Sequence, residues 1–374
     1  MEIPVGEEII RRAVRARHDL HRLAEKSLEE KETKAYMASF LREETSFRVT
    51  DRGSWLYAVR EADLPGGEGP VAFAADLDAL PIDETVALPW ASRHPGVSHK
   101  CGHDGHMAAL LGLALALEGR LLSRTVYLIL EPGEEIGAGG EICAALIGEK
   151  GIREVYAFHN RPGFPLGTVV CRGGSIQCAS MGLRLRFEGK AAHAGEPEAG
   201  RNPALAMARL VEETDAYARL PRENGVWCTV VGLRAGSGDF GVSAGEGEVS
   251  LTLRAERQAD LDGLRAHAVR TAALLAEAGG LDVSVKNSDV FPETANDPAL
   301  AEKVLSAAEG LGFPTLRLPK PWLASEDFGW YTRQCPGAIF YVGCGENWPD
   351  LHTAGYDFND AVLPVAVRLF AALI

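Results

Sequence analysis

Residues 99–106, with the sequence His-Lys-Cys-Gly-His-Asp-Gly-His, concentrate a thiol, a carboxylate and three imidazoles in one short stretch. These are the side chains that hold zinc or another first-row divalent metal. Cys101 and His103 are separated by one glycine in a loop just before an expected helix, so their side chains can converge on one ion. We therefore predict that both are metal ligands. His106 would lie on the first turn of the helix, as a supporting or packing residue.

Two pairs of acids follow apolar strands. Asp76 and Asp78 come after the strand expected at 71–75, and Glu134 and Glu135 come after a later one. Open α/β sheets place their sites beyond the carboxyl ends of the strands. Adjacent residues of an extended segment point in different directions, so one glutamate can bind metal while its neighbour carries a proton. The alternatives are a solvated turn for the first pair and, for the second, the acid-rich start of a helix.

Three further histidines stand alone in the sequence. His159 closes the strand expected at 155–158, and His352 lies in the late loop Asp350-Leu351-His352-Thr353-Ala354-Gly355. A lone histidine is usually structural, but these two fall where a strand end and a loop can reach the same cleft. His193 lies among glycines and alanines, which suits a loop of close approach. We expect it to act on a substrate from outside the metal-binding domain.

The composition limits the classes of protein to consider. A chain of 374 residues exceeds the size of one typical core, so two domains are expected. The net charge of −14 argues against nucleic acid and anionic membranes as partners, and an anionic substrate would need a local cation. Seven scattered cysteines without a CxxC pair indicate a reducing compartment, and acids precede any apolar run at the N-terminus. We therefore expect a cytoplasmic protein.

Short apolar strands alternate with helices in the first part of the chain, which predicts an α/β fold with a mostly parallel sheet covered on both faces. After Gly173-Gly174 the strands alternate apolar and polar residues, so we expect an inserted α+β domain at 178–289 and a discontinuous first domain, 1–177 and 290–374. The expected helices cover residues 7–25, 103–119, 139–148, 203–219 and 260–278, and the expected strands cover 54–60, 71–75, 125–130, 155–158, 181–187, 227–233, 249–254 and 338–342.

One motif misleads. Gly236-Ser237-Gly238-Asp239-Phe240-Gly241 matches the GxGxxG pattern of dinucleotide-binding proteins and follows a strand. No helix follows, because Gly245 and Gly247 lead into the strand at 249–254. Without a helix N-terminus the motif has no binding site for a pyrophosphate, so we reject nucleotide binding. The sequence also lacks a GxSxG elbow and a Walker A motif.

With these residues the chain resembles the M20 metallopeptidase/amidohydrolase family, in the branch of bacterial hippurate hydrolases, N-acyl-amino-acid amidohydrolases and plant auxin-conjugate hydrolases. The resemblance covers nearly the whole chain, and its motifs occur in the family's order. They are His21–Glu25, Ala75–Pro81, Cys101–His106, Pro132–Glu135, His159, Gly189–His193, Glu326–Phe328 and Leu351-His352.

The resemblance implies a zinc-peptidase-like catalytic domain with two divalent metals. From the ligand types we expect zinc or manganese first and cobalt or nickel next. The resemblance also implies Glu134 as general base, Asp78 as an orienting acid, and a lid domain that forms a homodimer. His193 matches a lid histidine that stabilises the oxyanion, and Arg254 matches an arginine that holds a substrate carboxylate. The implied metal ligands are Cys101, His103, Glu135, His159 and His352.

The chain also departs from the family pattern. The usual Gln-Pro-Ala before Glu-Glu is Glu131-Pro132-Gly133, the usual Arg before Ala-Asp-x-Asp is Ala74, and the lid's Asn-Val-Ile-Pro is Gly241-Val242-Ser243-Ala244. The metal set is intact, so we expect hydrolysis of an N-acyl amino acid or a dipeptide, while the lid changes leave the substrate open. A strict dipeptidase or aminopeptidase is one alternative, and a non-catalytic module that binds metal or conjugates is another.

Overall fold

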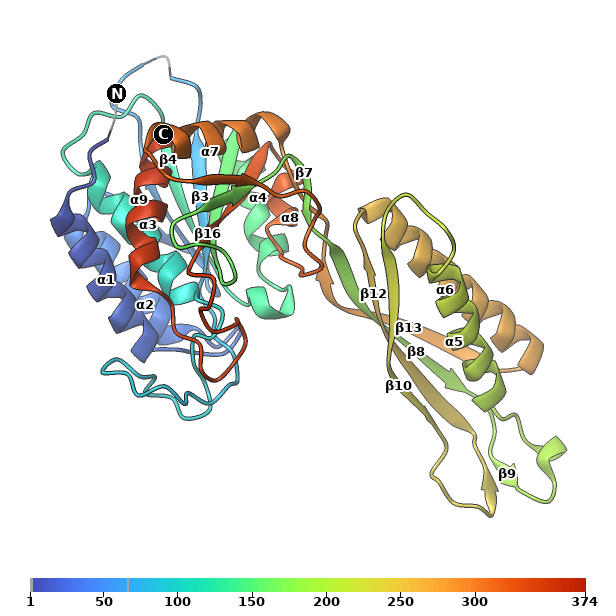
Figure 1. Cartoon of the computed structure of the whole chain (residues 1–374). Helices are drawn as coiled ribbons and strands as arrows, with labels where there is room; N and C mark the ends of the chain where they lie inside the picture. The colour runs from blue at the N-terminus through green and yellow to red at the C-terminus, as the bar shows by residue number, and fades with distance from the viewer. Residues whose placement is uncertain (1–2, 66) are drawn as a thin grey trace. The chain divides into compact units, whose positions relative to one another are not determined.

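The computed structural model describes residues 3–65 and 67–374 (Figure 1). The chain forms two compact units. Unit 1 comprises the chain up to Ile176, Thr294–Lys320 and Asp327–Ile374, and unit 2 comprises Gln177–Glu293 and Pro321–Glu326. The last segment was not expected in the inserted unit. It joins unit 2 because the Cys178 amide donates to the carbonyls of Trp322 and Ala324, at 3.2 and 3.1 Å.

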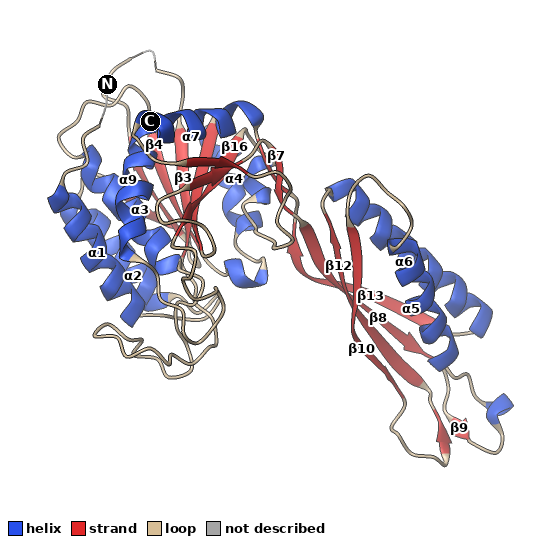
Figure 2. Ribbon diagram, viewed as in Figure 1, coloured by secondary structure: helices blue, strands red, loops and turns tan. Residues whose placement is uncertain are grey.

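Unit 1 is built on an eight-stranded, mixed but mostly parallel sheet with helices on both faces (Figure 2). The strand order is β1-β2-β4-β3-β5-β16-β6-β15, in which β4, β3, β5 and β16 run parallel to one another. The strands are β1 (Arg48–Asp51), β2 (Leu56–Arg60), β3 (Val71–Asp76), β4 (Val126–Glu131), β5 (Glu154–Arg161), β6 (Val169–Cys171), β15 (Thr315–Arg317) and β16 (Gly337–Gly343). The carboxyl ends of the parallel strands share one edge, which is the edge expected to hold the site.

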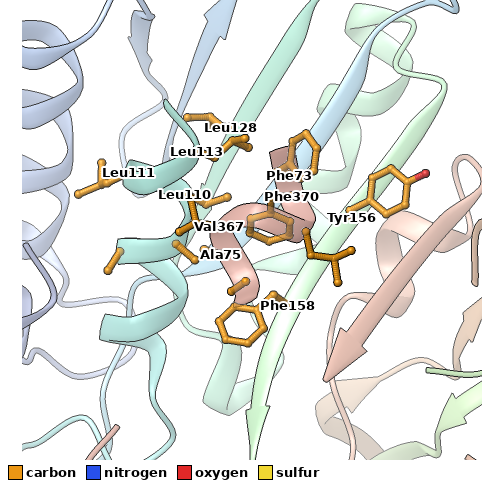
Figure 3. Packing of buried hydrophobic residues seen from close by; sticks show 14 of the residues in the cluster. Phe73, Ala75, Leu110, Leu111, Leu113, Leu128, Tyr156, Phe158, Val367 and Phe370 are labelled. Atoms are coloured by element: carbon orange, nitrogen blue, oxygen red, sulfur yellow. The ribbon is translucent and has the colours of Figure 1, made fainter. Parts of the chain in front are cut away.

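Helix α3 (His103–Leu117) is the centre of the unit 1 core. All fifteen of its residues are buried, as expected for a helix that is apolar on every face. Leu110 and Leu113 pack with aromatic residues of the sheet and of α9 (Leu363–Ala372), among which Phe73 and Phe370 meet edge to face at 5.0 Å (Figure 3). This packing fixes the start of α3, and therefore His103, at the strand ends.

Several unit 1 elements were not predicted. Helix α2 (Lys31–Glu44) buries Met37, Ala38 and Leu41, but its N-cap, Glu30, makes no capping hydrogen bond, so the usual start signal is absent. The strands β7 (Gly174–Gln177) and β14 (Thr294–Asn296), which were not predicted either, pair with each other.

The remaining elements of unit 1 are α1 (Glu7–Arg22), η1 (Glu134–Ile136), α4 (Gly140–Lys150), α7 (Pro298–Gly310), α8 (Gly329–Thr332) and η3 (Asp360–Val362).

Unit 2 is an antiparallel four-stranded sheet of order β10-β12-β8-β13, with two helices on one face (Figure 2). Its final strand β13 was not predicted; it completes a β-α-β-β-α-β order. The elements are β8 (Ala179–Glu188), α5 (Ala204–Ala218), β10 (Val226–Ala235), β12 (Glu246–Ala255), α6 (Gln258–Gly279) and β13 (Asp282–Phe291), with η2 (Pro197–Ala199) and the small ribbon β9 (Ala192–His193) with β11 (Val242–Ser243). In neither unit do the described residues include a helix long and apolar enough to cross a membrane.

Candidate metal and catalytic site

Cys101 lies at the centre of a cluster of possible metal ligands in unit 1. Its Sγ atom is 3.4 Å from Nε2 of His159 and 3.4 Å from Nε2 of His352. The donor atoms of Cys101, His103 and His159 all lie within 4.8 Å of one another, and so do those of Cys101, Glu135 and His352. The structure thus brings all five predicted ligands together, as two groups that share one thiol.

The local backbone explains how these ligands meet. Gly102 has a φ of 102°, and a Cβ at this position would collide with the side chain of Asn160, so the turn between Cys101 and His103 requires glycine. His352 has a φ of 61°, and its amide donates to the Lys100 carbonyl at 2.8 Å.

The expectation that His159 closes its strand was wrong. β5 continues to Arg161 because its pairing with β16 extends as far as Gly343. His159 is therefore held inside the strand rather than in a loop after it.

Hydrogen bonds set the tautomers of two histidines. His103 donates from Nδ1 to the carbonyl of Asp78 at 2.9 Å, and His159 donates from Nδ1 to the carbonyl of Asn160 at 2.7 Å. In the neutral form of each ring, Nε2 therefore carries a lone pair toward the cluster. Nε2 of His103 and Oε1 of Glu135 are buried without a hydrogen-bond partner, which costs about 1–3 kcal/mol for each group. A divalent cation satisfies both, so this donor set fits a metal.

Burial also favours the metal-binding form of His159 and His352. It lowers the pKa of His159 well below its usual value and lowers the pKa of His352, so both imidazoles are neutral at neutral pH. Burial raises the pKa of Glu135 to about 7, because its carboxylate has left water. A bound cation acts in the opposite direction and favours the carboxylate.

Asp78 anchors the turn that carries Glu134 and Glu135. Its two carboxylate oxygens accept the Glu134 amide at 3.2 Å and the Glu135 amide at 3.1 Å, and the second also accepts the Ser27 hydroxyl at 2.6 Å. The expectation of an extended segment here was wrong, because Gly133 has a φ of 66° and starts the 3-10 turn η1. The two carboxylates converge, at 3.7 and 3.8 Å from Nε2 of His103.

Asp76 and His106 support the cluster from behind. Asp76 bonds Nδ1 of His106 at 3.0 Å, and Nε2 of His106 bonds Oδ1 of Asn160 at 2.7 Å. Asn160 in turn donates to the Cys101 carbonyl at 3.1 Å. His106 is thus a supporting residue, as expected. Asn160 was missed because the predicted strand ended at residue 158, two residues before it.

A buried ionic network, also missed from the sequence, ties α1 to the metal-binding loop. His21 bonds Asp104 at 2.7 Å and Glu84 at 2.9 Å, and Lys100 bonds Glu84 at 2.6 Å. Arg17 is fully buried, 3.7 Å from Asp104. Burial would lower the pKa of His21, but the two acids outweigh it and raise that pKa to about 9. His21 is therefore charged at neutral pH.

The remaining two predicted site residues belong to unit 2. His193 is exposed on β9, and its Nδ1 accepts the Gly195 amide at 3.0 Å, which leaves the proton on Nε2. Arg254 is half-buried on β12. Its Nη1 donates to the Leu323 carbonyl and, at 2.7 Å, to the Ser325 hydroxyl.

Comparison with known proteins gives one consistent result. The sequence model of peptidase family M20/M25/M40 matches residues 72–374. An N-acetylcysteine deacetylase of Bacillus subtilis is 29% identical over 97% of this chain and 96% of its own length. An N-acetyldiaminopimelate deacetylase of Leuconostoc mesenteroides is 28% identical over 96% of this chain and 95% of its own length. A crystal structure of a dinuclear metal-binding M20 peptidase from Bacillus subtilis superposes with a TM-score of 0.81 at 26% identity, covering 98% of each chain.

The shared thiol gives a first testable prediction. Cys101→Ala should lower the affinity for divalent metal by at least about 10-fold, because both ligand groups lose a donor. The measurement is bound metal per chain by elemental analysis, with circular dichroism to check the fold. Cys171→Ala removes another buried thiol, away from the cluster, and should keep its metal. A Cys101→Ala protein with full metal content would show that the ligands are misassigned.

Proposed function

Because this chain belongs to peptidase family M20/M25/M40, we propose that it is a metal-dependent amidohydrolase that cleaves small N-acyl amino acids. One observation carries the proposal: two ligand groups share Cys101, and Glu134 lies beside them, 3.7 Å from His103. Relatives of this chain are named as deacetylases of N-acetylated amino acids.

Cys101, His103, Glu135, His159 and His352 would hold two divalent ions, zinc or manganese first and cobalt or nickel next. When bound, such ions polarise an amide carbonyl and lower the pKa of water.

Glu134 is the proposed general base. Its carboxylate accepts a proton from the water that attacks the amide carbonyl and returns that proton to the leaving nitrogen, so the residue ends unchanged. Asp78 holds Glu134 in place by accepting its backbone amide, at 3.2 Å. Asp78 is therefore an orienting residue.

Two residues of unit 2 are proposed to contact the substrate. His193 offers an Nε2–H donor to the oxyanion of the tetrahedral intermediate, in the tautomer that its bond with Gly195 selects. Arg254 is proposed to hold the substrate carboxylate. Its Nη1 is fixed on Leu323 and Ser325, and among the described residues its other N–H groups form no hydrogen bond. They are available for an anion.

The alternatives remain a dipeptidase or aminopeptidase and a non-catalytic module. A binding module would not need Glu134 next to the ligand Glu135, and this favours an enzyme. We also propose a cytoplasmic location, because all seven cysteines are free, and five of them are buried.

A homodimer is proposed through the edge strand β10 of unit 2. The other edge strand, β13, carries Lys286 and Asn287 and is irregular near its end, which discourages pairing. On β10 the side chains of Val230, Val231 and Leu233 are 44%, 67% and 48% exposed. An apolar edge of this kind pairs readily with a second copy.

Glu134→Gln tests the reaction. The amide keeps the shape of the side chain but cannot accept a proton, so hydrolysis of N-acetyl and N-benzoyl amino acids should slow by about 10²–10⁴-fold with metal retained. Product release and metal content are measured on the same samples. Glu141→Gln, on α4, is the control and should behave as the wild type. If Glu134→Gln hydrolyses the substrates at a near-normal rate, Glu134 is not the general base. If this variant loses its metal, Glu134 is a metal ligand instead.

His193→Ala should slow turnover by about 10²–10³-fold without changing metal content, the usual effect of losing one oxyanion donor. If His193 serves the partner's site, mixing this variant with Glu134→Gln subunits creates one intact composite site per hybrid dimer. Activity should then return after subunit exchange. If subunit exchange is confirmed and no activity returns, His193 acts only in its own subunit or only packs within unit 2.

Val231→Lys tests the dimer. Burying a valine contributes about 1.5 kcal/mol, and an ammonium at the same place adds a desolvation cost, so the dissociation constant should rise at least about 10-fold. Sedimentation over a range of concentrations measures it. Leu121→Lys, in unit 1, replaces a side chain that is 74% exposed and should leave the dimer unchanged. A monomeric wild type, or a variant that dimerises normally, would refute pairing through β10.

A further inference from the structure

Three carboxyl groups meet in the interior of unit 1, beside the ligand cluster. Asp76 ends β3, Glu131 ends β4, and Asp327 lies just before α8. Their oxygen atoms lie within 4.8 Å of one another, and Glu131 and Asp327 are each 1% exposed. Carboxylates this close in a dry interior repel one another strongly, so they cannot all be ionised without a counter-charge.

Within residues 3–65 and 67–374, no lysine or arginine forms an ion pair with Glu131 or Asp327. The groups that face the pair are uncharged or acidic. They are the Tyr331 hydroxyl on α8, the Cys143 thiol on α4, and Asp76 and Asp78 at the end of β3. The counter-charge must therefore be a proton or a bound cation.

The hydrogen bonds assign the proton to Glu131. Oδ2 of Asp327 accepts the Gly140 amide at 2.9 Å, at the start of α4, where the helix dipole favours an ionised carboxylate. Oε2 of Glu131 accepts the Tyr331 hydroxyl, but Oε1 is buried with no hydrogen-bond partner. A proton on Oε1 lets Glu131 donate to Asp327 and satisfies both groups. Burial and Asp327 together raise the pKa of Glu131 well above its usual value.

We propose that Glu131 and Asp327 hold one proton between them, and that this hydrogen-bonded pair positions the turn that carries Glu134 and Glu135. The pair joins the end of β4 to the starts of α8 and α4, so it fixes both ends of the 131–140 segment. Glu131 stands where the family pattern has glutamine. A neutral glutamic acid has a donor O–H where glutamine has an NH2 group, and both have a carbonyl acceptor, but only the acid carries a proton that can be lost.

The proton makes stability depend on pH with a definite sign. Unfolded carboxyl groups ionise above about pH 4.3, whereas the folded pair keeps its proton, so unfolding releases a proton. The stability that this pair contributes is therefore fully present below that pH. It is lost as the pH rises toward the raised pKa of the pair in the folded protein. Over that window the unfolding equilibrium constant of the wild type should increase about tenfold per pH unit relative to Glu131→Gln.

The experiment compares wild type, Glu131→Gln and Glu141→Gln, each with metal removed and with metal restored. Infrared spectra at about pH 8, where free carboxyls are ionised, should show the carbonyl band of a neutral carboxylic acid in the wild type and in Glu141→Gln. Glu131→Gln should lack the band. Denaturant unfolding between about pH 6 and 9 should show the steeper pH dependence in the two proteins that keep Glu131.

A wild-type spectrum without the band, or equal pH dependence in all three proteins, overturns the shared proton. A third divalent ion that is lost in Glu131→Gln assigns the counter-charge to a cation and overturns it too. The positioning role is read from kcat. Glu131→Gln should stay within about threefold of wild type at neutral pH, while Glu131→Leu, which cannot form these hydrogen bonds, should fall at least about 10-fold.

Equal loss of kcat in Glu131→Gln and Glu131→Leu overturns the positioning role. The positioning role rests on the proposed amidohydrolase activity, but the infrared and unfolding measurements do not. If the wild type hydrolyses no N-acyl amino acid, the proposed function is wrong. The infrared and unfolding measurements still show whether Glu131 and Asp327 share a proton.

Discussion

The buried side chain of Asp78 is the constraint on which the arrangement of the site depends. Its carboxylate accepts two successive backbone amides, of Glu134 and Glu135, and the Ser27 hydroxyl. Its carbonyl accepts Nδ1 of His103 and so determines which nitrogen of that ring faces the cluster. An ionised carboxylate in a dry interior is costly unless such donors surround it. Once it is satisfied in this way, one residue sets the positions of a proposed base and two proposed ligands.

The polar site is stable because an apolar framework and a second layer of polar contacts enclose it. Helix α3 is buried along its whole length, and its first residue is His103. Behind it, Asp104 pairs with His21 of α1, and Asn160 bonds both His106 and the Cys101 loop. The ligands themselves come from segments between Cys101 and His352. The cluster can therefore assemble only when nearly all of unit 1 has folded.

The sequence was informative where a local signal was strong. The apolar strands β3 and β4 and the helix after the Cys101 loop were predicted to within a few residues, and the residues predicted as ligands lie close together in the structure. Helix α2 was missed because its start has no capping residue, and β13 because its outward-facing residues are mostly polar. The 3-10 turn of Glu134 could not be predicted, since it depends on a backbone reversal at Gly133.

Supporting residues were the hardest to predict. Asn160 and Glu131 lie in strands whose periodicity says only that they are buried. Glu131 bonds Tyr331, 200 residues away, and Asn160 bonds His106 and the Cys101 carbonyl, 54 and 59 residues away, and no local pattern encodes such partners. Both residues lie just beyond the strands predicted at 125–130 and 155–158, so neither was recognised as a buried polar group that needs partners.

The pairing of β7 with β14 has an architectural consequence. The chain passes from unit 1 to unit 2 at the end of β7 and first returns at β14, and these two strands are hydrogen-bonded neighbours; the short segment Pro321–Glu326 later joins unit 2 as well. The two ends of the main insertion, Gln177–Glu293, are therefore adjacent, and a short loop is long enough to join them. Inserted modules whose ends lie close together place little strain on their host. The scaffold can thus exchange or resize its inserted module over evolutionary time while the metal-binding framework is retained.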